Sequence, residues 1–170
     1  MIVFRATAKL LTRLGEPVSD PVASTTVLGD WFAKPFPVAQ RRFIVLASEK
    51  SRIAVLMPGR DVANLPRGFP SVMAQVLAGL GIPPDAVARE VEACQDYAVA
   101  TTAGNKSMLG TLNDHAAMMQ WRLRDIAVPD LVAESVSLSH TPMSPLGFRF
   151  AADVARELFG LQSLHPRHPF

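Results

Sequence analysis

The stretch RFIVLASEKSRIAVLM, Arg42–Met57, carries the clearest structural signal in the chain. Residues 42–47 and 52–57 form two apolar runs that include β-branched side chains, and the four polar residues 48–51 join them. Two such runs at this spacing predict an antiparallel β-hairpin. Because both runs are almost continuously apolar, we expect the hairpin to be covered on both faces or to lie centrally in its sheet.

Helical and extended patterns alternate on both sides of this hairpin. The expected elements are a strand at 1–5, a short helix between Thr7 and Gly15, helices at 66–80 and 84–94, a strand at 97–102, and helices at 107–125, 129–138 and 151–159. Residues 27–32 are apolar without a clean period and stay ambiguous between strand and helix. The mixture predicts an α+β fold with a small, mainly antiparallel sheet covered by helices.

Composition indicates a single domain. The chain has 170 residues, of which 49% are hydrophobic and 19% are charged, enough to form one core. We expect residues 1–160 to form this domain and residues 161–170 to be a mobile C-terminal tail.

The sequence also predicts a cytoplasmic protein without a membrane partner. Cys94 is the only cysteine, so no disulfide can form within the chain, and a reducing compartment is favoured. Arg5 and Lys9 interrupt the apolar N-terminus before a secretory signal could form. No stretch approaches the roughly 20 uncharged apolar residues that a membrane-spanning helix needs.

A second informative stretch, Tyr97–His115, reads as a short strand, a tight polar turn and the start of a long helix. The first amide groups of a helix lack partners within the helix and carry partial positive charge, so they can hold a phosphate or a carboxylate. The turn is not a P-loop, because Ala100 and Asn105 occupy the positions of the required glycines. The candidate ligand-binding residues belong to the turn and to a polar stripe along the helix: Asn105, Lys106, Ser107, Asn113 and Gln120.

The same residues also have a purely structural explanation. Asn105 or Ser107 would cap the helix and Lys106 would be solvated. The polar stripe would then be an exposed flank of the helix. Both interpretations stay open at the level of sequence.

Basic residues form two groups that could meet in the folded chain. Arg5, Lys9 and Arg13 recur every four residues, and Arg41 and Arg42 open the hairpin. If the groups converge, they would bind a phosphate-bearing ligand or a nucleic acid; if they do not, they are solubilising charge. The formal net charge of +2 does not by itself indicate a nucleic-acid-binding protein.

Three segments carry a family resemblance: Leu28–Trp31, the hairpin, and Asn105–Asp114. The last has the pattern Asn-x-Ser-x-x-Gly-x-x-Asn-Asp as a signature. Together they resemble an uncharacterised bacterial family known only as a domain of unknown function, over a length from Met1 to about Leu158. The resemblance implies a small bacterial cytoplasmic protein, and it supplies no activity, cofactor or catalytic residue.

The favoured function is a non-catalytic binding or accessory protein with an anion or phosphate site at the turn 104–107. The alternative is a small hydrolase or nuclease that uses Asp30, Asp114 and Lys106, if folding brings them together. Asp114 and His115 cannot act as a pair, because neighbours on a helix point about 100° apart. No histidine spacing matches a metal site, so we expect no metal and no cofactor.

Overall fold

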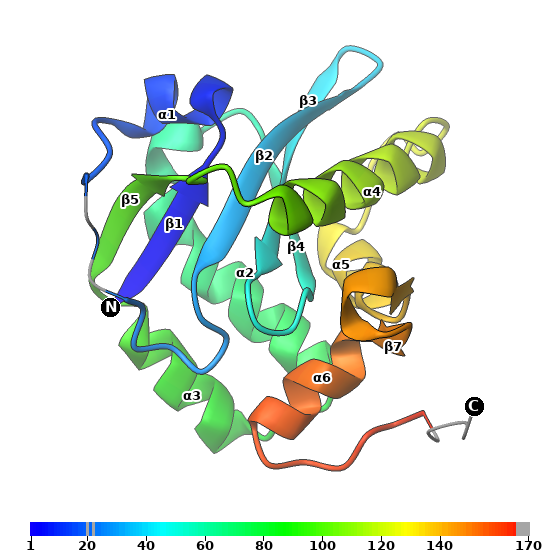
Figure 1. Cartoon of the computed structure of the whole chain (residues 1–170). Helices are drawn as coiled ribbons and strands as arrows, with labels where there is room; N and C mark the ends of the chain where they lie inside the picture. Colours follow the sequence, from blue (N-terminus) through cyan, green and yellow to red (C-terminus); the bar gives the residue numbers. More distant parts are fainter. Residues whose placement is uncertain (20, 22, 166–170) are drawn as a thin grey trace.

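A five-stranded mixed sheet forms the centre of the fold (Figure 1). The computed structural model describes residues 1–19, 21 and 23–165. The strands are β1 (Ile2–Ala6), β2 (Trp31–Val38), β3 (Arg41–Ser48), β4 (Ala54–Pro58) and β5 (Tyr97–Thr101). They lie in the order β4-β3-β2-β1-β5, with β3 antiparallel to both of its neighbours and β1 parallel to both of its own.

Helices pack on both faces of this sheet (Figure 1). They are α1 (Ala8–Leu14), α2 (Leu65–Gly79), α3 (Pro84–Ala93), α4 (Lys106–Arg122), α5 (Leu131–Ser139) and α6 (Ala151–Leu158). Single 3-10 turns occur at Val62–Asn64 and Ser144–Leu146, and β6 (Pro142–Met143) pairs with β7 (Arg149–Phe150). The α+β prediction is confirmed. None of the helices in the described part of the chain is long and apolar enough to cross a membrane.

Strand β3 is buried on both faces, as its continuous apolar run predicts. Ile44 and Leu46 belong to the core that α2 covers. Phe43, Val45 and Ala47 point to the other face and belong to the core that α4 covers. Successive side chains of a strand alternate between faces, so a strand between two helical layers needs apolar residues at nearly every position.

Helix α4 buries one face against the sheet. Met108, Leu112, Met119 and Leu123 each have 0% of their surface exposed. They pack against β2, β3 and β4 in the second core. The 3.6-residue period of a helix places these four positions on one side, so their burial fixes the rotation of α4 about its axis.

Strand β2 differs from the sequence prediction, which left residues 27–32 undecided and gave no strand beyond them. Pro35 and Pro37 interrupt its pattern, because proline has no N–H to donate within a sheet. Strand β1 pairs with β2 only as far as Ala33, so both prolines lie where β2 pairs with β3 alone. This half of β2 is an edge strand, and an edge strand tolerates the missing donors.

Helix α5 closes the outer edge of β4. The N–H groups of Ala54 and Leu56 point away from β3 and donate to the hydroxyl oxygens of Ser139 (3.1 Å) and Ser135 (2.8 Å). The two serines are four residues apart and therefore share one face of α5. An uncovered edge would expose unpaired donors to another chain, so the serines complete the sheet without a further strand.

The segment after α6 begins the tail expected from the sequence. The buried carboxylate of Asp153 accepts hydrogen bonds from the N–H of Leu164 (2.6 Å) and contacts Nδ1 of His165 at 2.9 Å. The ring of His165 stacks on Phe150. Residues 161–165 are therefore tied to α6 and β7, whereas residues 166–170 of the expected mobile tail lie outside the described residues.

The serine contacts with β4 give a first prediction. Ser135→Ala leaves the N–H of Leu56 buried without an acceptor, which should lower the free energy of unfolding by about 1–3 kcal/mol. Denaturant unfolding followed by circular dichroism measures the change. Ser137→Ala is the matched control, because Ser137 is an exposed serine of the same helix whose hydroxyl contacts only Arg122 among the described residues. Equal losses in the two variants would contradict the role given to Ser135.

Candidate functional site

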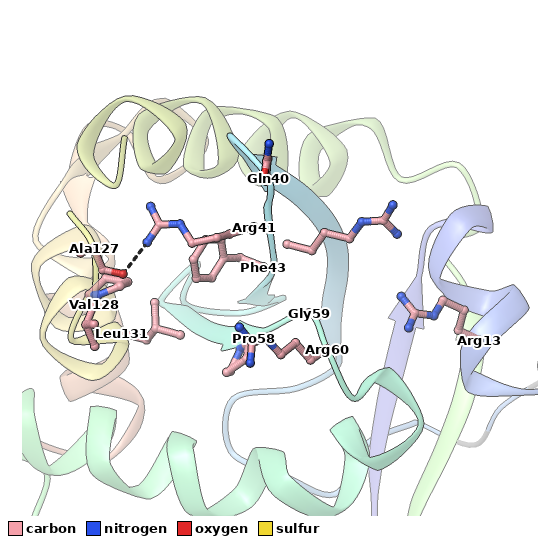
Figure 2. A pocket seen from close by; sticks show the side chains of 12 residues that line it. Arg13, Gln40, Arg41, Phe43, Pro58, Gly59, Arg60, Ala127, Val128 and Leu131 are labelled. Carbon is pink, nitrogen blue, oxygen red and sulfur yellow. Dashed lines mark hydrogen bonds between the residues drawn. The ribbon is translucent and has the colours of Figure 1, made fainter. Parts of the chain in front are cut away.

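A cavity of about 740 Å³ opens beside the N-terminal end of β3 (Figure 2). Its walls come from α1, the β2–β3 turn, the segment after β4 and the loop between α4 and α5. Four of its lining side chains are arginines: Arg13, Arg41, Arg42 and Arg60. None of the described residues that line it is acidic. The cavity therefore gathers positive charge from three separate segments without a carboxylate in its described lining.

A single glycine allows two of these segments to meet. The N–H of Gly59 donates to the carbonyl oxygen of Arg42 at 2.8 Å. A Cβ atom at this glycine would lie only 2.8 Å from the backbone carbon of Arg42, closer than real Cβ atoms approach. The close approach brings Arg60, the next residue, to the same cavity as Arg42.

A smaller cavity of about 110 Å³ adjoins the first and adds a lysine. It shares Arg13, Arg42 and Gly59 with the larger cavity and is also lined by Lys9. Lys9 and Arg13 are four residues apart on α1, so both reach the same side of the helix. The structure thus brings together Lys9, Arg13, Arg41 and Arg42 from the two basic groups of the sequence.

The remaining basic candidate, Arg5, lies elsewhere. Its Nε donates to the carboxylate of Asp30 at 2.6 Å, and its Nη1 donates to the carbonyl oxygen of Thr101 at 3.3 Å. Asp30 is buried and also accepts from the hydroxyl of Ser24 at 2.6 Å. This group joins three segments of the fold, and Arg5 does not line either basic cavity.

The cavity arginines differ in what they already bind. Arg41 donates to the carbonyl oxygens of Leu123 (2.6 Å), Ile126 (2.6 Å) and Ala127 (3.1 Å), and so satisfies backbone acceptors after α4. Its guanidinium also lies 5.5 Å from the centre of the Phe43 ring.

The other cavity arginines are not engaged in this way. Within residues 1–19, 21 and 23–165, no hydrogen bond or ion pair engages the side chains of Arg13, Arg42 and Arg60, which are exposed. These three arginines, which we call the free arginines, can each offer a planar fork of N–H donors to an anion.

The turn proposed from the sequence is mostly occupied by internal contacts. The side chain of Asn105 caps α4 by accepting from the N–H of Met108 at 3.1 Å. The hydroxyl of Ser107 accepts from Nη2 of Arg52 at 3.3 Å. Lys106 is exposed at the first position of the helix, and no hydrogen bond or ion pair engages its side chain in the described chain.

The polar stripe of α4 is exposed and lies beside β2. Asn113 accepts a hydrogen bond from Nζ of Lys34, and Gln120 donates to the carbonyl oxygen of Pro37 at 3.0 Å. Both contacts tie α4 to β2. The two residues therefore have a structural role. The helical pattern in the sequence could not distinguish this role from ligand binding.

Arg52 is a residue that the sequence analysis did not select. It adopts a left-handed backbone conformation (φ 65°) in the β3–β4 turn and extends to the start of α4. Its Nη1 contacts Sδ of Met108, and burial lowers its pKa, an effect that the charge of Glu49 opposes. Only the folded structure shows that Arg52 contacts Ser107, because 55 residues separate the two in the sequence.

The residues of the enzyme alternative are spread out. Asp30 is held by Arg5 and Ser24, whereas Asp114 and Lys106 are exposed on α4. No hydrogen bond or ion pair between any two of Asp30, Asp114 and Lys106 occurs in the described residues. Nor does any group of three His, Cys, Asp or Glu side chains in that part of the chain gather as a metal site.

His115 is buried on the sheet side of α4. Only 1% of its surface is exposed, and its Nε2 lies 3.3 Å from the carbonyl oxygen of Arg52. Burial lowers the pKa of His115, although the Arg52 carbonyl and the charge of Asp114 act in the opposite direction. Burial therefore favours the neutral form of the imidazole.

The comparisons with known proteins identify one family. A family model described as "Domain of unknown function (DUF6933)" matches residues 3–154. A search of curated proteins and a search of solved structures find no match.

His115 gives a prediction of pH dependence. Its pKa is lowered in the folded chain and returns to about 6.5 on unfolding, so protons bind the unfolded state more tightly. The free energy of unfolding should therefore fall as the pH drops below about 6.5, by about 1.4 kcal/mol for each unit of pKa difference. Denaturant unfolding from about pH 7.5 to pH 5 measures this loss. His115→Gln should lose less stability over the same range, and parallel curves for the two proteins would contradict the prediction.

Proposed function

The chain belongs to the DUF6933 family, a domain of unknown function, and we propose that it is a non-catalytic binding protein for a phosphate-bearing ligand. The observation that carries the proposal is the set of free arginines, Arg13, Arg42 and Arg60, around one cavity without an acidic residue. A guanidinium matches the geometry of a phosphate through two parallel hydrogen bonds. An anion in the cavity would also relieve the repulsion between like charges.

Binding without catalysis suits the chemistry of the cavity. Its described lining offers cations, apolar side chains and one amide, Gln40, but no carboxylate, imidazole, thiol or hydroxyl side chain. A hydrolase or nuclease needs a group that activates water or acts as the nucleophile. The alternative built on Asp30, Asp114 and Lys106 has less support, because the carboxylate of Asp30 already binds Arg5 and Ser24.

The proposed anion site differs from the turn 104–107 favoured by the sequence. Asn105 and Ser107 use their side chains within the protein, which leaves Lys106 as the free cation of that turn among the described residues. The cavity offers three free cations. The turn therefore becomes the natural comparison in any test of binding.

We also propose a cytoplasmic location. Cys94 is a free thiol that is buried, and burial together with the charge of Glu90 raises its pKa to about 12. Such a thiol is protonated and unreactive at neutral pH, and it remains reduced most readily in a reducing compartment.

The proposal predicts binding of inorganic pyrophosphate, measured by isothermal titration calorimetry at low salt. Arg42→Ala should weaken this binding about 10- to 100-fold, the effect of losing hydrogen bonds to a charged group. The affinity should also fall as the salt concentration rises, because exposed charges are screened.

Lys106→Ala is the matched control, since it removes a cation from the turn and leaves the cavity intact. It should bind pyrophosphate like the wild type. Loss of binding in Lys106→Ala with normal binding in Arg42→Ala would move the site to the turn. No binding of pyrophosphate to the wild type would overturn the proposal.

A further inference from the structure

The basic cavity has two chemically different sides, and we propose that it binds a nucleoside diphosphate or triphosphate. This inference rests on the proposed phosphate-binding function and specifies the ligand. The phosphates would lie against the free arginines. The nucleoside would lie against the opposite, apolar side.

The apolar side comes from the loop between α4 and α5. Figure 2 shows Ala127, Val128 and Leu131 on one side of the cavity and Arg13 on the other. Val128 has 89% of its surface exposed, and Pro58 adds an exposed apolar ring to the lining. When a ligand covers an apolar side chain that is so exposed, the removal of apolar surface from water favours binding. The cavity therefore suits a ligand with an uncharged organic part as well as phosphates.

Arg41 lines the cavity beside its apolar side and supplies a flat guanidinium. Three carbonyl oxygens, from Leu123, Ile126 and Ala127, fix its guanidinium in place. A guanidinium plane stacks well on an aromatic ring, and here it does not have to be ordered when the ligand arrives. Stacking on a planar base is the contact that this surface favours.

The number of cations and the shape of the site favour a small ligand with more than one phosphate. Arg13, Arg42 and Arg60 line the larger cavity, and Lys9 faces the adjoining one. Four positive charges match a chain of two or three phosphates better than a single phosphate. The volume of about 740 Å³ lies within the range of about 300–1,000 Å³ typical of small-molecule sites. Because the cations line a hollow and not a flat face, the site favours a nucleotide over a nucleic-acid strand.

Calorimetric titrations can test the contributions of the phosphates and of the nucleoside separately. The probes are pyrophosphate, adenosine, AMP, ADP, ATP, GTP and geranyl diphosphate, the last being a diphosphate with a flexible apolar chain. ADP or GTP should bind about tenfold more tightly than pyrophosphate, the order of effect that stacking of one base contributes. Adenosine should bind more weakly than either.

Val128→Ser tests the apolar side without disturbing the core, since Val128 is exposed. It should weaken nucleotide binding several-fold and leave pyrophosphate binding unchanged. Val18→Ser is the matched control, because Val18 is 49% exposed and its N–H contacts the carbonyl oxygen of Val99 in β5. Arg42→Ala should weaken the binding of nucleotides and of pyrophosphate alike.

The failures of the two proposals are distinguishable. If pyrophosphate binds as tightly as every nucleotide, or geranyl diphosphate binds more tightly than any of them, the nucleotide inference is overturned and phosphate binding stands. If neither pyrophosphate nor any nucleotide binds, both proposals fall. An equal effect of Val128→Ser and Val18→Ser on nucleotide binding would overturn the role of the apolar side.

Discussion

Burial of β3 on both faces is the constraint on which the rest of the structure depends. The side chains of β3 belong alternately to two separate cores, one under α2 and one under α4. A strand of this kind is stable only when helices exclude water from both sides. The alternation continues beyond the core: Arg41 lies on the α4 side and binds carbonyl oxygens after that helix, whereas Arg42 faces α1. The cavity thus forms at the N-terminal end of β3, next to the part of the strand that helices cover on both faces.

Some stretches of the sheet have a neighbouring strand on one side only, so their backbone groups on the other side need another solution. Ser135 and Ser139 accept the outward N–H groups of β4, so a helix replaces a sixth strand. Pro35 and Pro37 lie where β2 has lost its β1 neighbour, so the missing donors cost little there. The serines cover the edge of β4, and the prolines remove donors from the free edge of β2. The turn between β2 and β3 extends past β1 (Figure 1).

Patterns that repeat along the chain could be predicted from the sequence, and contacts between distant segments could not. The hairpin and the buried face of α4 follow from local periods of two and 3.6 residues. Strand β2 was missed because its prolines interrupt the same kind of pattern. At the turn 104–107 the sequence shows polar groups but not their partners, and Arg52, 55 residues away, is one of them. Arg60 was missed because its closeness to Arg42 depends on the backbone contact at Gly59.

The arginines named above differ in whether they have acceptors within the fold. Arg5 and Arg41 each have acceptors within the protein, so their charges stabilise contacts between segments. Arg13, Arg42 and Arg60 share a cavity without a carboxylate in its described lining, and like charges favour an anion between them. Among the other exposed cations, Arg89 is paired with Asp85 on the same helix, whereas no hydrogen bond or ion pair in the described chain engages Lys106. Three arginines gathered in one hollow that also exposes apolar side chains fit the proposed ligand better than a role in solubility alone.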